Sequence, residues 1–275
     1  MTKQKLFISL LALIILFAII SFLAILRHNN GLNSFALEAG FGGKAVCNIL
    51  GINLHGSLVT YSLPVDENSV QADETSSEDI VGAIKEAEDN STIKAILLEV
   101  DSLGGSPVAG EEVADALRSA TKPTVALIRG YGDSAAYLAA TGAERIFSSK
   151  FSDVGGIGVT MSYEDYSRQN KEEGITYNSL TSGKFKDTFS PDKTLTEEER
   201  VLAMRDLEIM HQSFVEKVVE NRGLPLAKVA ALADGSTMLG AMALQEGLID
   251  QIGGQIEVNS YLRGKIGEEP EYCWE

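Results

Sequence analysis

Short apolar runs alternate along the chain with segments whose apolar residues recur at helical spacing. The runs, which are rich in β-branched residues, are Ala45–Leu54, Ile93–Val100 and Thr124–Arg129. Ser106-Pro107 begins one helical segment, because serine is a good N-cap and proline suits the first helical position. Strand–helix–strand units of this length imply parallel strands joined by right-handed crossovers. The pattern predicts an α/β fold, in which functional sites lie at the carboxyl ends of strands.

Glycine-containing segments follow these runs, and other segments have weaker patterns. His55-Gly56-Ser57, Asp101–Gly105 and Gly130–Asp133 are predicted to be turns, since glycine adopts backbone conformations that a β-carbon disfavours. Further along, the pattern predicts a helix over Tyr163–Gly174 and a short strand over Thr176–Leu180.

The chain also contains an acidic polar segment and one long helical segment. Pro64–Ser77 is predicted to be a loop. Thr196 and Glu199 have the spacing of a capping box, in which each side chain satisfies a backbone N–H at the helix start. The helix that they begin is predicted to end near Asn221.

Ser134 follows the Thr124–Arg129 run and begins a segment rich in alanine. Unpaired N–H groups at a helix start favour developing negative charge, which suits a nucleophile. Gly-Asp-Ser does not match the G-x-S-x-G pattern of nucleophile elbows, and a plain N-cap serine is the commoner role. Gly104 and Gly105 end the neighbouring predicted strand, so the topology brings them to the same sheet edge as Ser134.

A serine nucleophile needs a base, and the chain offers histidines and lysines for this role. None of the three histidines, His28, His55 and His211, lies in a glycine-rich segment like the one that holds Ser134. A Ser-His-Asp triad is therefore disfavoured. No group of His, Cys and Asp residues has the spacing of metal ligands, and we predict neither a metal nor a cofactor. A lysine remains, because burial lowers the pKa of its ammonium by up to about 3–5 units.

The N-terminal region contains an uncharged apolar segment, Leu6–Leu26, which is long enough to cross a bilayer core of about 30 Å. Lys3 and Lys5 precede it, which favours an N-terminus inside the cell and the remainder outside the cytoplasm. A cleaved signal peptide is the alternative, but its apolar region is normally about 7–15 residues, followed by an A-x-A-like site. We therefore predict a single-pass anchor in the cell membrane (1–28) and a spacer (29–44).

The chain has 275 residues and a formal net charge of −16. This charge argues against a nucleic-acid partner, because phosphate binding needs clustered Lys and Arg. Cys47 and Cys273 are the two cysteines, too few for a disulfide framework. Whether they pair with each other is left open by the sequence.

Six short motifs, in order along the chain, resemble those of signal peptide peptidase A, the membrane-anchored Ser-Lys peptidases of the protease IV group. The motifs are Asp101-Ser102-Leu103-Gly104-Gly105, Gly132-Asp133-Ser134-Ala135-Ala136-Tyr137, Gly155-Gly156-Ile157-Gly158-Val159, Ser182-Gly183-Lys184-Phe185-Lys186-Asp187 with Ser190-Pro191, Glu198-Glu199-Arg200, and Asp234-Gly235 with Gly247-Leu248-Ile249-Asp250. The resemblance extends over roughly residues 45–254. It implies a Clp/crotonase-like α/β fold of repeated β-β-α units, predicted for 45–258, with 259–275 as a C-terminal tail.

The resemblance also implies roles for individual residues. Ser134 would be the nucleophile and Lys186 the general base, while backbone N–H groups of Gly105 (or Gly104) and Ala135 would form the oxyanion hole. In the family, the serine and the lysine come from neighbouring subunits, which implies a ring-like homo-oligomer. The implied function is a serine endopeptidase that degrades remnant signal peptides or similar short apolar segments.

Several residues depart from the family's motifs. Gly156 stands where the family has a serine whose hydroxyl helps to hold the lysine, and Ser152 or Ser182 could substitute for it. Asp133, next to the nucleophile, would raise the pKa of a neighbouring lysine if its side chain points inward. Lys184 falls at a variable position and is expected to be solvated.

These departures keep other hypotheses open. The second hypothesis is a catalytically weak or inactive homologue that acts as an oligomeric membrane scaffold. A remoter one is the acyl-CoA chemistry of crotonase relatives, against which the anchor and the Lys186 motif count.

Overall fold

The computed structural model describes residues 47–62 and 73–275. The predicted anchor (1–28) and spacer (29–44) lie outside the described residues, as does most of the loop predicted for Pro64–Ser77. Within the described ranges, no helix is both long enough and apolar enough to cross a membrane.

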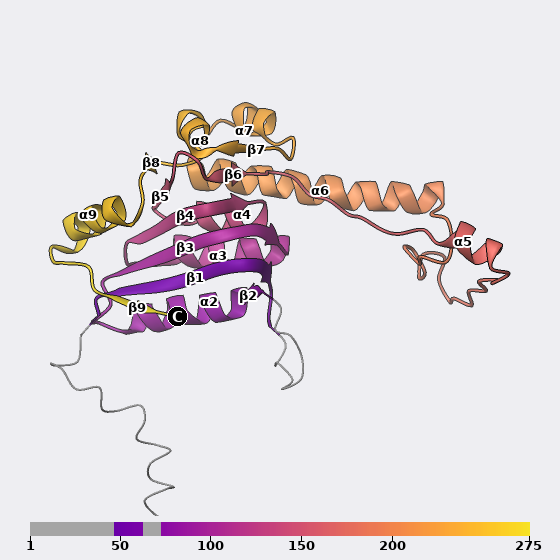
Figure 1. Ribbon diagram of the computed structural model, residues 1–275, viewed down its shortest axis with the longest axis horizontal. Coiled ribbons are helices and arrows are strands. Elements are labelled where there is room, and N and C mark those ends of the chain that lie inside the picture. Colours follow the sequence, from indigo (N-terminus) through magenta and orange to yellow (C-terminus); the bar gives the residue numbers. More distant parts are fainter. Residues whose placement is uncertain (1–46, 63–72) are drawn as a thin grey trace, which may run out of the picture. The chain divides into compact units, whose positions relative to one another are not determined.

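A nine-stranded sheet forms the centre of the described chain (Figure 1). The strands are β1 (Ile49–Val59), β2 (Glu74–Ser76), β3 (Ala95–Gly105), β4 (Thr124–Asp133), β5 (Arg145–Ser148), β6 (Asp153–Gly155), β7 (Thr237–Leu239), β8 (Gln251–Ile252) and β9 (Tyr272–Trp274). Six of them follow the order β2-β1-β3-β4-β5-β8, and all their pairings are parallel. The predicted alternation of parallel strands and crossover helices is thus confirmed.

Helices cover both faces of this sheet. The helices of the described residues are α2 (Ser77–Asp89), α3 (Pro107–Ser119), α4 (Ala135–Thr141), α5 (Ser167–Glu172), α6 (Glu197–Arg222), α7 (Leu226–Leu232), α8 (Gly240–Glu246) and α9 (Gln255–Ile266), of which α5 lies away from the sheet. Successive residues of a strand point to opposite faces, and so Ile96 and Leu98 enter the core shared with α2, α3 and α4. Leu97 enters a second core, which it shares with Val258 and Leu262 of α9.

Three glycine-containing segments that are predicted to be turns lie inside strands instead. His55-Gly56-Ser57 is part of β1, Asp101–Gly105 ends β3, and Gly130–Asp133 ends β4. The ladder shifts register between His55 and Ser57, and Gly56 has a φ of +62°. A glycine in this conformation makes a β-bulge, which bends a strand without reversing the chain.

The segment before α6 is less regular than its pattern predicts. Of the predicted helix Tyr163–Gly174, only Ser167–Glu172 is helical, and α5 buries none of its residues. The strand predicted for Thr176–Leu180 does not form, and Leu180 is fully exposed. Apolar spacing alone does not hold a short element without a surface to pack against. The capping box at the start of α6 is confirmed.

The C-terminal residues 259–275, predicted to be a separate tail, belong to the folded unit, which extends to Glu275. β9 pairs in parallel with the start of β1. A disulfide joins Cys47 to Cys273, with 5.6 Å between their Cα atoms. The ring of Trp274 lies over Gly51, where a β-carbon would come within 2.5 Å of it. The predicted boundary after residue 258 therefore falls within this unit.

Reduction of the Cys47–Cys273 disulfide is expected to release β9 and to lower the free energy of unfolding by about 2–4 kcal/mol. Trp274 is the single tryptophan of the chain, so its fluorescence reports on β9 directly. We expect a red shift of its emission on reduction, and a lower urea midpoint for Cys273→Ser. Emission and midpoint that are both insensitive to reduction would contradict this pairing.

Candidate active site

Ser134 lies between the end of β4 and the start of α4. Its backbone has φ 53° and ψ −125°, a conformation that costs a non-glycine residue about 1–3 kcal/mol. Its side chain makes no capping hydrogen bond to α4, while its N–H donates to the carbonyl of Gly155 at 2.7 Å. The plain N-cap role is therefore excluded, and the half-buried hydroxyl is left for another use.

The glycines at the end of β3 lie against this serine. A β-carbon on Gly104, whose φ is +107°, would lie 2.8 Å from Cβ of Ser134 and 3.1 Å from N of Ala135. The N–H of Gly104 donates to Oγ of Ser102 at 3.1 Å. Gly105 has a φ of +155°, and a β-carbon there would lie 2.1 Å from a carbonyl of β1. Only glycines allow this approach, and it brings two predicted site segments together.

A groove of about 570 Å³ opens in front of Ser134. Its lining consists of Leu103, Asp133, Ser134, Gly156, Gly158, Val159, Thr160, Met204, Leu207, Glu208, His211, Ala233, Asp234, Gly235 and Thr237. Among the described residues, no group of three or more His, Cys, Asp or Glu side chains is placed to hold a metal ion. The groove thus offers a half-buried serine beside an open surface of mixed polarity.

Asp133 points inward, which the sequence left undecided. Its side chain lines the groove although the residue is only 6% exposed, and its Oδ1 has no hydrogen-bond partner among the described residues. Burial, with a further contribution from the charge of Asp153, raises the pKa of the Asp133 carboxyl to about 6. This carboxyl is therefore an unsatisfied acceptor next to the candidate nucleophile.

Lys186, the predicted base, lies on the exposed loop between α5 and α6 and does not line the groove. Its ammonium has no ion-pair partner in the part of the chain that the structure describes. By contrast, Lys184 pairs with Glu198 at 2.6 Å, and both side chains are mostly exposed. Lys184 is thus solvated as predicted, and a single chain does not bring Lys186 to the groove that holds Ser134.

One wall of the groove comes from α6 and was not found from the sequence. Met204, Glu208 and His211 follow one another at helical spacing and all line the groove. Nε2 of His211 lies 2.9 Å from the carbonyl of Ala233. The spacing shows that these residues share a face of the helix, but it does not show which surface that face covers.

Neither of the two serines that could substitute for the hydroxyl missing at Gly156 does so within the described chain. Ser152 is buried, and its hydroxyl donates to the carbonyl of Arg129. Ser182 is exposed and does not line the groove. A β-carbon on Gly156 would lie 3.2 Å from N of Ser134 and 3.6 Å from Cβ of Asp133. The polar side chains beside Gly156 are therefore those of Thr237, whose hydroxyl donates to Asp153 at 3.3 Å, and of Asp133, whose Oδ1 has no partner among the described residues.

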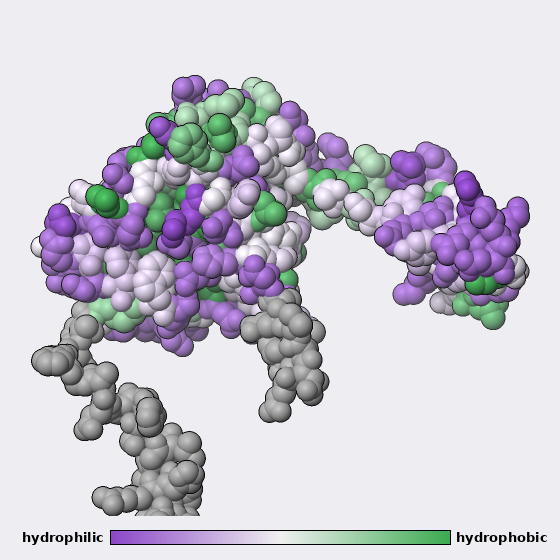
Figure 2. All heavy atoms as spheres, viewed as in Figure 1, coloured by the Kyte–Doolittle hydropathy of each residue, from purple (hydrophilic) through white to green (hydrophobic). Residues whose placement is uncertain are grey.

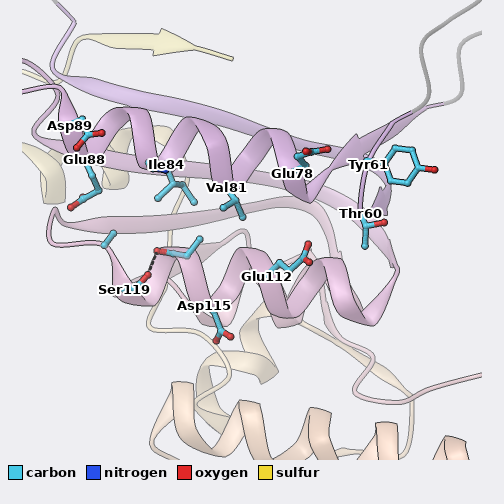
Figure 3. Close-up of a pocket in the computed structure, with 13 residues that line it drawn as sticks. Thr60, Tyr61, Glu78, Val81, Ile84, Glu88, Asp89, Glu112, Asp115 and Ser119 are labelled. Carbon is cyan, nitrogen blue, oxygen red and sulfur yellow. Dashed lines mark hydrogen bonds between the residues drawn. The ribbon is translucent and has the colours of Figure 1, made fainter.

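A larger hollow, about 940 Å³, lies between α2 and α3 (Figure 3). Three of its acidic side chains, Glu88, Glu112 and Asp115, already have local partners. Glu112 accepts from Ser77 at 2.5 Å, and Asp115 accepts from Lys217 at 2.9 Å. The hollow lacks Ser134 and the glycine-rich strand ends, and we assign it no chemistry.

Comparison with known proteins identifies the family. A model of peptidase family S49 matches residues 116–265, more than half of the chain. The chain belongs to peptidase family S49. A Clp protease model matches residues 67–150, and the mixed α/β fold resembles that of Clp proteases. A ClpP1 mutant from Listeria monocytogenes superposes with a TM-score of 0.48 at 14% identity, over 75% of this chain and 92% of that one.

Curated relatives of this S49 member include several proteases. A "Putative protease" of Methanocaldococcus jannaschii is 32% identical over 63% of this chain and 56% of its own length. The "Putative signal peptide peptidase SppA" of Enterococcus faecium is 27% identical over 82% and 64%, and Protease 4 of Haemophilus influenzae is 27% identical over 63% and 29%. This chain spans less than two thirds of the length of these relatives. The family match and these relatives confirm the resemblance to the signal peptide peptidase A family.

Gly104→Ala is expected to slow the reaction of Ser134 with a fluorophosphonate probe about tenfold or more. The added β-carbon would displace Ser134, and a displacement that costs 1.36 kcal/mol in the transition state slows a reaction about tenfold. The labelled peptide is located and quantified by mass spectrometry.

Gly82→Ala is the matched control for this experiment. A β-carbon at Gly82 in α2 would meet no atom within 4 Å, so labelling should be unchanged and α2 stabilised by up to about 1 kcal/mol. Wild-type labelling of a folded Gly104→Ala protein would refute the tight packing at Ser134.

Proposed function

We propose that this S49 member is a membrane-anchored serine endopeptidase in which Ser134 is the nucleophile and Lys186 of a neighbouring copy is the general base. The main support is the strained backbone of Ser134, whose hydroxyl does not cap its helix and lies at an open groove. Strain of this kind persists where the surrounding structure over-determines it, and it clusters at active sites.

The proposed reaction uses the groups that lie around Ser134. Neutral Lys186 would take the proton from Oγ of Ser134 as that oxygen attacks the peptide carbonyl, and would then protonate the leaving amine. Water would hydrolyse the acyl-enzyme by the same route. The N–H groups of Gly105 and Ala135 would stabilise the oxyanion. Gly105 is favoured over Gly104 because the Gly104 N–H already donates to Ser102.

Assembly of several copies would complete this site. Lys186 is exposed and unpaired within the described residues, as expected of a side chain that serves another copy. α6 exposes three apolar residues, Val201, Met204 and Ile209, at 60%, 54% and 59%. Figure 2 shows apolar residues in green on the surface over this helix. These features support the ring-like homo-oligomer that the family resemblance implies.

Features near the two ends of the chain support the proposed location and substrate class. The apolar segment Leu6–Leu26 would anchor the protein in the membrane. The Cys47–Cys273 disulfide suits an oxidising compartment, which supports a peptidase domain outside the cytoplasm. A peptidase tethered there would meet remnant signal peptides and similar short apolar segments.

A specific observation also favours the second hypothesis, an oligomeric scaffold with little or no turnover. Gly156 supplies no hydroxyl to orient the lysine, and neither Ser152 nor Ser182 replaces it within the chain. The two hypotheses share the fold and the assembly, so a measurement of turnover separates them.

The dyad is tested on the full chain in detergent with a fluorogenic apolar peptide. Ser134→Ala and Lys186→Ala should each abolish hydrolysis without changing the oligomer size. When the two inactive variants are dissociated, mixed and reassembled, some sites regain both groups. Random placement around a ring would restore about a quarter of the sites.

Lys184→Ala is the matched control, since Lys184 lies two residues away and pairs with Glu198. It should retain full activity. Turnover by either dyad variant would refute the dyad, and a mixture without activity would refute its division between copies. A folded wild-type oligomer that neither cleaves peptides nor reacts with the probe would favour the scaffold.

A further inference from the structure

We propose that Asp133 is a positioning residue that receives the ammonium of Lys186 from a neighbouring copy, in place of the hydroxyl missing at Gly156. This inference rests on the proposed function, because it assumes that Lys186 enters the groove beside Ser134. It assigns a role to the carboxyl of Asp133, the last residue of β4, which directly precedes the candidate nucleophile Ser134.

The first observation is that Asp133 lacks a partner where a partner is needed. Its side chain is almost fully buried, yet Oδ1 accepts no hydrogen bond among the described residues. A buried carboxylate without a donor costs free energy, and buried charges are normally paired. Asp133 also lines the open groove, so a donor can reach it from outside the chain.

The second observation is that the groove itself offers no suitable cation. Its lining, taken over the described residues, contains neither lysine nor arginine. The other titratable groups around Asp133 are Asp153 on β6, whose charge acts on it, and the groove-lining Glu208 and His211 on α6 and Asp234 before β7. Three of these four are acidic, and His211 already contacts the carbonyl of Ala233. The groove is thus complementary to a single incoming ammonium group.

The third observation is the space at Gly156. A β-carbon there would lie 3.2 Å from N of Ser134, 3.4 Å from Cγ2 of Thr237 and 3.6 Å from Cβ of Asp133. The hydroxyl of Thr237 already donates to Asp153 at 3.3 Å, so Asp133 is the neighbour left to hold a group near the place where a serine on residue 156 would project. Lys186 is exposed and has no ion-pair partner in the described chain, a property that it shares with Lys85, Lys150 and Lys171. The proposed dyad is what selects Lys186 among them.

This arrangement has a measurable consequence for the base. An ionised Asp133 stabilises the protonated form of Lys186, so the pKa of Lys186 rises and less of it is neutral at a given pH. Removing the charge should lower that pKa, by about 1–3 units for an adjacent opposite charge. Asp133 would then orient the lysine while shifting peptidase activity toward alkaline pH.

The experiment measures the pKa of Lys186 without relying on turnover. The full chain, assembled in detergent, is acetylated with acetic anhydride across neutral to alkaline pH, and the rate at each lysine is measured by mass spectrometry. Asp133→Asn should lower the midpoint for Lys186 by about one unit or more, and Asp133→Glu should largely preserve it. Lys184, on the same loop, is the internal reference and should not change.

Glu208→Gln is the matched control, since it removes one charge from an exposed carboxyl of the same groove. It should move the Lys186 midpoint much less than Asp133→Asn. In parallel, the acid limb of the peptidase pH profile should move to lower pH in Asp133→Asn. Asp133→Ser removes the same charge and is the second variant if the asparagine protein does not fold.

The outcomes separate this inference from the proposed function. An unchanged Lys186 midpoint in folded Asp133→Asn or Asp133→Ser overturns the role of Asp133, even where the dyad variants confirm the peptidase. A lowered midpoint in a protein that shows no turnover supports the ion pair and refutes the peptidase. A midpoint that moves equally in Glu208→Gln overturns the specific pairing, because the effect would then reflect the general charge of the groove.

Discussion

The geometry of this molecule depends on a close approach of three strand ends around Ser134. The N–H of Ser134 donates to the carbonyl of Gly155 at 2.7 Å, and a β-carbon on Gly104 would lie 2.8 Å from Cβ of Ser134. A serine with φ 53° persists only where such contacts hold it. The ends of β3 and β6 supply these contacts with glycine backbone. The glycines therefore shape the site because the absence of a side chain lets their backbones approach Ser134 closely.

The same principle continues beneath the site. All seven residues of α4 are buried, and α3 approaches so closely that a β-carbon on Gly110 would lie 2.6 Å from the carbonyl of Ala135. The hydroxyl of Tyr137 donates to the carbonyl of Leu248 at 2.9 Å, which ties α4 to the segment after α8. Because α4 is packed this closely on all sides, it cannot shift to relax the strained backbone of Ser134. The packing of α4 thus fixes the geometry of the site.

What the sequence could predict was local. Apolar runs, caps and strand-end glycines identified the alternation of strands and helices and brought Gly104 and Ser134 to one sheet edge. Gly56 could end a strand in a turn or form a β-bulge within it. Pairing with the neighbouring strand decides between the two, and the local sequence pattern does not record that pairing. The same holds for His211. The sequence shows which face of its helix His211 occupies, but it does not show that this face lines the groove. The pairing of β9 with β1 joins residues 226 positions apart at the disulfide, a contact that no local pattern records.

A single copy of this chain contains two groups of opposite charge that lack ion-pair partners among the described residues. Asp133 is a buried carboxyl with an unsatisfied oxygen, and Lys186 is an exposed ammonium without an anion among the described residues. In a lone copy the buried carboxyl is unfavourable and the exposed ammonium is solvated, and the proposed contact between copies would supply the carboxyl with a donor. The contact that favours assembly would then be the one that delivers the base to Ser134. On this reasoning, an isolated copy would hold a strained serine without a base, and peptide hydrolysis would begin only when a neighbour completes the groove.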